Sequence, residues 1–207
     1  YVCRKNVMLS LNIDKITEKD LKAVVDTAAK RLVEASGSSM ELLDYTSYAD
    51  RSTTPGHYVV FWEVGGGESE GEVANTSTTT SMAYKKKRAC EEQEEERKQR
   101  SSAAGDEVVG GGPKAEEWEE VLAECAALMD GSLVEAGYVT SRKMGSIGPL
   151  ELCVVRRGTF SRLLDRFMQS GAAMTQYKTP RCLVSADALA LLRSSAVASF
   201  FSPATLS

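Results

Sequence analysis

The residues whose side chains could act as nucleophiles, general bases or metal ligands are few and scattered. The 207-residue chain contains one histidine, His57, and five cysteines, which are Cys3, Cys90, Cys125, Cys153 and Cys182. Histidine titrates near neutral pH and can serve as a general base. His57, however, opens a predicted strand beside a Pro-Gly turn and has no evident partner, so a structural role is favoured.

The cysteine pattern excludes two kinds of site. No Cys-x-x-Cys occurs, and a single histidine leaves a Cys/His zinc centre short of ligands. An odd number of dispersed cysteines indicates free thiols in a reducing compartment, rather than a disulfide framework. We expect Cys153 and Cys182 to pack inertly in apolar strands.

Two glycine runs, residues 65–67 and 110–112, could in principle approach a phosphate group. A phosphate loop lies between a strand and a helix, and a lysine opens that helix. Neither run is followed directly by such a lysine and helix. The sequence therefore predicts no phosphate loop of its own.

The composition is that of a soluble protein, with 43% hydrophobic residues, 26% charged residues and a formal net charge of -4. This balance gives no general attraction for nucleic acid or for an anionic membrane. No apolar run approaches the ~20 residues that cross a bilayer, and residues 1–6 lack the features of a secretory signal. We expect a cytoplasmic protein without membrane or nucleic-acid partners. The first residue is Tyr1 rather than a methionine, which suggests a fragment or an incomplete gene model.

The elements that must position any site fall into two patterned zones. In the first zone, residues 1–64, apolar residues recur at helical spacing after Thr17 and Asp20, which form a near capping box. This zone predicts a strand, a helix and a two-stranded hairpin, at residues 7–12, 17–35, 41–49 and 57–64. A Thr-Pro-Gly turn joins the two hairpin strands.

The middle zone, residues 65–113, has few large apolar residues and cannot bury enough surface to offset chain entropy. It predicts a disordered, low-complexity insertion. A basic cluster at residues 85–88 could serve nuclear import or nucleic-acid binding. A glutamate-rich run at residues 91–96 follows at once, so mutual neutralisation is favoured.

The second patterned zone, residues 114–207, completes the same domain. It predicts a helix that ends near residue 131, a strand at 150–155, a helix at 159–170, an extended segment at 179–184 and a last helix at 186–199. Trp118, Phe160 and Phe167 lie at helical spacing, which favours core positions over ligand stacking. The fold class is therefore α+β, with helices that cover a small, mainly antiparallel sheet.

Several phrases occur in one order and together resemble a known domain. They are Asn12-Ile13-Asp14-Lys15, Asp44-Tyr45-Thr46-Ser47-Tyr48-Ala49-Asp50, Pro55-Gly56-His57-Tyr58-Val59, Ser146-Ile147-Gly148-Pro149-Leu150-Glu151 and Gln176-Tyr177-Lys178-Thr179-Pro180-Arg181-Cys182. In this order they resemble the C-terminal domain of the plant acyl-acid amido synthetases, the Gretchen Hagen family of auxin-responsive enzymes within the adenylate-forming superfamily. The sequence around Lys15 is more similar to the branch of this family that contains the jasmonate-conjugating members.

The resemblance implies a ligase reaction. Such enzymes use ATP and Mg²⁺ to activate a hormone carboxylate, such as indole-3-acetic acid or jasmonic acid, as an acyl-adenylate, and then transfer the acyl group to an amino acid. In the family, the phosphate loop and the acid pocket lie in a larger N-terminal domain, for which this chain has no counterpart. The resemblance therefore implies a mobile lid that needs that domain as its partner and is inactive alone.

The resemblance also implies roles for five residues. Lys178 matches the family's ATP-contacting lysine in this domain, where an ammonium stabilises the charge that spreads over the phosphates. Tyr177 adjoins it and would stiffen the segment and contact the nucleotide, and Lys15 could turn toward the nucleotide after adenylation. Arg4 and Lys5 fall near the hinge between domains. From the residues alone, each is an ordinary solvated side chain.

Two further classes of function remain open. A small α+β domain without an active-site partner could be a non-catalytic binding or regulatory module. A nucleic-acid binder that uses residues 85–88 is the weakest alternative.

Overall fold

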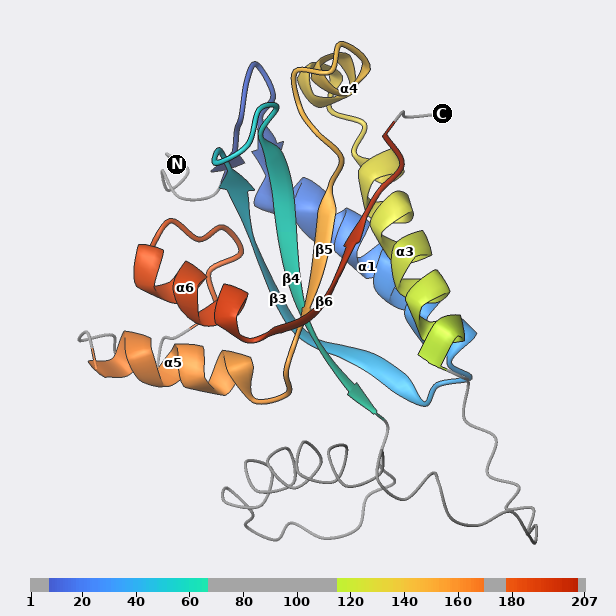
Figure 1. The fold of residues 1–207 in the computed structure, drawn as a ribbon, viewed down its shortest axis with the longest axis vertical. Helices are drawn as coiled ribbons and strands as arrows, with labels where there is room; N and C mark the ends of the chain where they lie inside the picture. The colour runs from blue at the N-terminus through green and yellow to red at the C-terminus, as the bar shows by residue number, and fades with distance from the viewer. Residues whose placement is uncertain (1–7, 67–114, 170–177, 205–207) are drawn as a thin grey trace, which may run out of the picture. The chain divides into compact units, whose positions relative to one another are not determined.

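The fold is arranged around β4 (His57–Gly66), a strand whose two faces are both buried. The computed structural model describes residues 8–66, 115–169 and 178–204 (Figure 1). Tyr58, Val60 and Trp62 point into one hydrophobic core, while Val59 and Phe61 point into another. This alternation explains why the sequence of β4 is a continuous apolar run: side chains alternate between the faces of a strand, and here each face meets a layer of helices.

The sheet has four strands in the order β3-β4-β5-β6. β3 (Met40–Asp50) and β4 form an antiparallel hairpin, β5 (Glu151–Val155) runs parallel to β4, and β6 (Ala196–Phe201) is antiparallel to β5. β3 and β6 are therefore the edge strands. The predicted fold class is confirmed: the domain is α+β with a mostly antiparallel sheet.

Two layers of helices cover the sheet (Figure 1). α1 (Glu18–Ala35) and α3 (Ala115–Ser132) pack on one face, whereas α5 (Thr159–Gln169) and α6 (Ala186–Ser194) pack on the other. Trp118 and Phe167 are partly buried against these cores, and Phe160 is buried in one of them. The expectation that these aromatic residues serve packing is confirmed.

Helix α1 begins where the sequence predicts. The Thr17 side chain accepts a hydrogen bond from the backbone N–H of Asp20, and the Asp20 carboxylate accepts one from the backbone N–H of Thr17. This reciprocal box satisfies backbone donors that a first helical turn leaves unpaired. The apolar face of α1 is buried as expected.

Three elements differ from the prediction. The last helix ends at Ser194 rather than residue 199, because residues 196–201 form β6, which pairs with β5. α4 (Ala136–Lys143) was not predicted: its N-cap is Glu135, and its buried residues are Tyr138, Ser141 and Arg142, which form no apolar stripe. The first strand is shorter than expected, since β1 (Met8–Leu9) pairs with β2 (Ile16–Thr17) across a turn.

The predicted insertion, residues 65–113, falls almost wholly outside the described residues. Its first two residues belong to β4, which extends to Gly66. Among the described helices, none combines the length and apolarity that a bilayer crossing requires.

Candidate functional site

The segment that carries Lys178 lies along the edge strand β3. Ser47 and Cys182 form an isolated parallel bridge, in which Ser47 N donates to Arg181 O at 2.9 Å and Leu183 N donates to Ser47 O at 2.7 Å. The predicted extended conformation after Lys178 is therefore stabilised by backbone pairing to a strand that is more than 130 residues earlier in the chain.

Side chains of β3 extend this attachment toward Lys178. The Asp44 carboxylate accepts from Thr179 Oγ1 at 2.6 Å and from Arg181 Nη1 at 2.5 Å. Thr46 Oγ1 donates to the carbonyl of Pro180 at 2.5 Å. The segment is thus held on both sides of a proline, whose φ is itself fixed by the ring.

Lys178 borders a hollow of about 620 Å³ between this segment, β3 and the first half of α1. The charged residues that line it are Glu18, Lys22, Asp26, Asp44, Lys178 and Arg181. Two of the cations are paired, Lys22 with Asp26 at 2.5 Å and Arg181 with Asp44 at 2.5 Å. Lys178 is exposed and forms no ion pair within the described part of the chain. Its ammonium is available to an external anion.

The Arg181 guanidinium is occupied in two further ways. It lies 4.1 Å from the centre of the Tyr45 ring, and it donates to the backbone carbonyl of Tyr45. A planar guanidinium suits this combination of stacking and hydrogen bonding. Burial raises the pKa of Tyr45 more than the nearby Arg181 lowers it. Because the pKa is raised overall, the phenol stays neutral.

The structure places Lys15 away from this hollow, whose lining does not include it. Its side chain is exposed, while its backbone N–H donates to Glu135 Oε2 at 3.4 Å. Asp14, beside it, is fully buried and accepts from the backbone N–H of Asn12 at 2.7 Å and from the hydroxyl of Tyr58. Asp14 shapes the turn that presents Lys15 and is not a solvated charge. Arg4, Lys5 and Tyr177 lie outside the described residues.

His57 belongs to a buried polar cluster at the start of the two central strands, β4 and β5. Its Nε2 lies 3.2 Å from Glu151 Oε2, and Arg193 Nη1 donates to Glu151 Oε1 at 2.9 Å. Burial alone would raise the pKa of Glu151, but the hydrogen bonds from His57, Arg193 and Ser199 outweigh it and lower the pKa to about 2. Glu151 is ionised and fully partnered, which agrees with the structural role expected for His57.

Comparison with known proteins decides the family. A family model described as the GH3 family C-terminal domain matches residues 19–187, which include Lys178 and the whole of β3. The chain belongs to the GH3 family.

Relatives of this GH3 domain are amido synthetases and ligases. The jasmonoyl–L-amino acid synthetase JAR4 of Nicotiana attenuata is 39% identical over 206 residues, 99% of this chain and 27% of the relative. The 4-substituted benzoates-glutamate ligase GH3.12 of Arabidopsis thaliana is 40% identical over 202 residues, 98% of this chain and 28% of the relative. The chain thus spans little more than a quarter of the length of these relatives.

A solved structure, that of the GH3.15 acyl acid amido synthetase, superposes with a TM-score of 0.69 at 29% sequence identity. The match covers 99% of this chain and 28% of that protein. The arrangement of helices and strands in the GH3 domain is therefore that of a C-terminal domain in a longer enzyme.

The cysteines of the described GH3 domain are packing residues. Cys125, Cys153 and Cys182 are free and buried. Burial raises the pKa of the Cys153 thiol to about 11 and also raises that of Cys182. A buried thiol with a raised pKa is a poor nucleophile, so the expectation that Cys153 and Cys182 pack inertly is confirmed.

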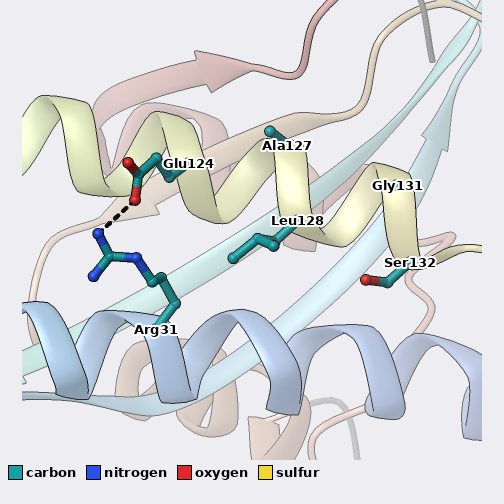
Figure 2. Close-up of a pocket in the computed structure, with 6 residues that line it drawn as sticks. All are labelled: Arg31, Glu124, Ala127, Leu128, Gly131 and Ser132. Carbon is teal, nitrogen blue, oxygen red and sulfur yellow. Dashed lines mark ion pairs between the residues drawn. The ribbon is translucent and has the colours of Figure 1, made fainter. Parts of the chain in front are cut away.

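A second hollow of about 530 Å³ lies on the outer side of the α1–α3 pair. Figure 2 shows Leu128 of α3 in the space between the two helices, beside the ion pair between Arg31 and Glu124 at 2.7 Å. The other residues that line this hollow are the small Ala127, Gly131 and Ser132. This hollow offers no unpaired charge for a phosphate.

Sequence reasoning did not identify the residues that hold the Lys178 segment. Asp44 and Arg181 both stand in phrases that resemble the family, but no local pattern indicates that they meet.

Among the described residues, no group of three or more histidine, cysteine, aspartate or glutamate side chains could hold a metal ion.

Proposed function

We propose that this chain is the C-terminal lid of an ATP-dependent ligase, which joins a plant hormone carboxylate to an amino acid through an acyl-adenylate. The acid is indole-3-acetic acid or jasmonic acid, and the reaction takes place in the cytoplasm. The observation that supports this proposal best is the exposed ammonium of Lys178, which has no ion partner among the described residues and stands at the start of a segment fixed to β3. Family membership adds that the relatives are amido synthetases.

The proposed chemistry has two steps. In the first, a carboxylate oxygen of the hormone attacks the α-phosphorus of ATP, and pyrophosphate leaves. The ammonium of Lys178 stabilises the negative charge that builds on the phosphate oxygens in the transition state. In the second, the amine of the amino acid attacks the acyl carbonyl, and AMP leaves as the C–N bond forms.

Closure of the lid would exclude water, which otherwise hydrolyses the acyl-adenylate. Mg²⁺, when bound with ATP, supplies further charge neutralisation at the phosphates. We place its ligands, the phosphate loop and the acid pocket in the N-terminal domain that longer relatives possess. The chain alone is then inactive.

The decisive experiment measures hormone-dependent exchange of pyrophosphate into ATP. The chain is assayed alone and as a chimaera, in which it replaces the matching C-terminal quarter of a jasmonoyl–amino acid synthetase. We expect no exchange from the chain alone and clear exchange from the chimaera. Lys178→Ala should lower the rate by on the order of 100-fold, the loss typical of one stabilising donor.

Two controls make the result specific. Lys22→Ala removes a cation that lines the same hollow but is paired with Asp26, and Lys143→Ala removes an exposed cation on α4. Both should leave the exchange rate within about twofold of the parent chimaera. A folded chimaera that is inactive, or an active one that is indifferent to Lys178→Ala, would favour the alternative of a non-catalytic binding module.

Lys15 has a separate proposed role in the second step. Since it projects from a turn outside the Lys178 hollow, Lys15→Ala should lower amide formation in the chimaera and leave pyrophosphate exchange unchanged. Equal loss in both assays would show that Lys15 has no separate role in the second step.

Tyr177 remains a predicted nucleotide-contact residue, and Arg4 and Lys5 remain predicted hinge residues.

A further inference from the structure

The backbone pairing of the Lys178 segment stops short of the lysine. The hydrogen bonds to β3 use the carbonyl of Arg181 and the amide of Leu183. Pro180 has no N–H to donate, so the backbone ladder cannot extend through it to Thr179. The residues between the bridge and Lys178 therefore need another attachment if the direction of the lysine is to be fixed.

Asp44 supplies that attachment with both of its carboxylate oxygens. One oxygen accepts from Thr179 Oγ1 at 2.6 Å and the other from Arg181 Nη1 at 2.5 Å, so a single side chain joins the residues on either side of Pro180. Thr46, two residues further along β3, binds the Pro180 carbonyl at 2.5 Å. Residues i and i+2 of a strand project from the same side, so the two side chains act together.

Asp44 also sets the charge of the hollow. By pairing with Arg181, it leaves Lys178 as the one unpaired cation among the described residues that line this hollow. An incoming anion consequently meets one available ammonium instead of two competing cations.

We propose that Asp44 is a positioning residue: it fixes residues 179–181 on β3 and thereby directs Lys178 toward the substrate phosphate. This inference rests on the proposed function for the identity of the anion, whereas the attachment itself is a property of the chain alone. Catalysis is sensitive to small displacements, since a misplacement of about 1 Å can lower a rate by on the order of 100-fold.

The first experiment tests the attachment without any catalysis. Trypsin can cleave after Lys178 and after Arg181, and mass spectrometry of the 207-residue chain identifies each cut. Asp44→Asn keeps the shape of the side chain but loses its charge toward Arg181, so cleavage at these two sites should become roughly fivefold faster through local opening. Asp26→Asn, which alters another exposed carboxylate of the hollow, should leave both rates unchanged. Equal cleavage in Asp44→Asn and the parent chain would overturn the proposal.

The second experiment uses the chimaera and separates kcat from KM. Asp44→Asn should lower kcat for pyrophosphate exchange by roughly tenfold and leave the KM for the hormone acid unchanged, because no acid contact is altered. Thr179→Val should lower kcat less than Asp44→Asn does, since it removes one of the two partners of Asp44. Thr179→Ser keeps the hydroxyl and should retain the kcat of the parent chimaera.

The outcomes distinguish the two proposals. If Lys178→Ala is silent, the proposed function fails, whatever trypsin shows. If Lys178→Ala is damaging and Asp44→Asn increases cleavage but leaves kcat unchanged, the ligase proposal survives and the positioning role of Asp44 is refuted.

Discussion

Two aspartate–arginine pairs in this molecule have similar chemistry but opposite surroundings. Arg142 and Asp130 join α4 to α3 at 2.8 Å, with side chains only 2% and 1% exposed. Arg181 and Asp44 join the Lys178 segment to β3 at 2.5 Å, with side chains 28% and 24% exposed. The first pair is sealed inside the fold, and the second lies at the rim of a hollow.

The buried pair is the centre of a larger network. Asp130 also accepts from the hydroxyls of Tyr138, at 2.6 Å, and Ser202, while Arg142 Nη2 donates to the carbonyl of Pro203 at 2.9 Å. These contacts connect the end of α3, helix α4 and the chain after β6. Removal of one partner would leave a buried charge without compensation, so this pair is a requirement of the fold. The rim pair has access to water, which leaves it free to serve a site.

The largest expected effect sharpens this contrast. Arg142→Ala should lower the free energy of unfolding by about 3–5 kcal/mol, because it strands the Asp130 carboxylate in the interior. Chemical denaturation of the chain measures it. The neighbouring Lys143→Ala, on an exposed position of α4, should change the value by less than about 0.5 kcal/mol. A loss near 1 kcal/mol for Arg142→Ala would show that the two pairs are energetically alike.

The next effect concerns Glu151, another buried carboxylate. Glu151→Gln should cost about 1.5–3 kcal/mol at pH 6, the usual worth of hydrogen bonds to a charged group. Because the pKa of Glu151 falls from 4.5 to about 2 on folding, its contribution is complete above pH 4.5 and is lost as the pH falls toward 2. The difference between parent and variant, measured by denaturation, should therefore shrink across that interval. The control is Glu34→Gln, at an exposed position of α1, which should change the free energy of unfolding by less than about 0.5 kcal/mol. A difference that stays constant with pH would contradict the assignment.

The elements of the fold differ in how well the sequence predicts them. The capping box of α1 and the apolar run of β4 are local signals, and both elements appear where predicted. Residues 196–201 continue a run rich in alanine and leucine without a glycine or proline, so local propensity favoured helix. Pairing with β5 overrides that propensity and gives a strand whose exposure alternates residue by residue.

The candidate site was predictable only in part. The phrase around Lys178 predicted that lysine as a site residue, which stays a prediction, and the Pro-containing segment was expected to be extended. Its attachment to Asp44 and Ser47 joins residues some 135 positions apart, and no periodicity or spacing encodes such a contact. The same holds for Glu151, which occupies an apolar strand and gives no sequence signal that it is paired.

A smaller effect tests the rim pair itself. Arg181→Ala should lower the free energy of unfolding by about 1 kcal/mol, because an ion pair that reaches solvent contributes little and the bridge through Ser47 uses only the backbone of residue 181. Thermal denaturation of the chain, with Arg142→Ala as the comparison, measures the ratio between the two arginines. A loss of more than about 3 kcal/mol would place the Lys178 segment in the structural core of the domain.

The smallest effect on stability is expected at the most important residue of the proposed site. Lys178→Ala should change the free energy of unfolding by less than about 0.5 kcal/mol, since the ammonium is exposed and has no ion partner among the described residues. A residue selected for stability would show a cost, whereas one held for an external phosphate shows none until that phosphate is present. ATP should accordingly stabilise the parent chimaera against thermal unfolding more than it stabilises the Lys178→Ala chimaera, because a ligand stabilises only to the extent that it binds the folded state. Equal stabilisation of the two proteins by ATP would show that Lys178 does not contact the nucleotide. The contrast would then fail, because Arg142 would keep its structural role and Lys178 would have no functional one.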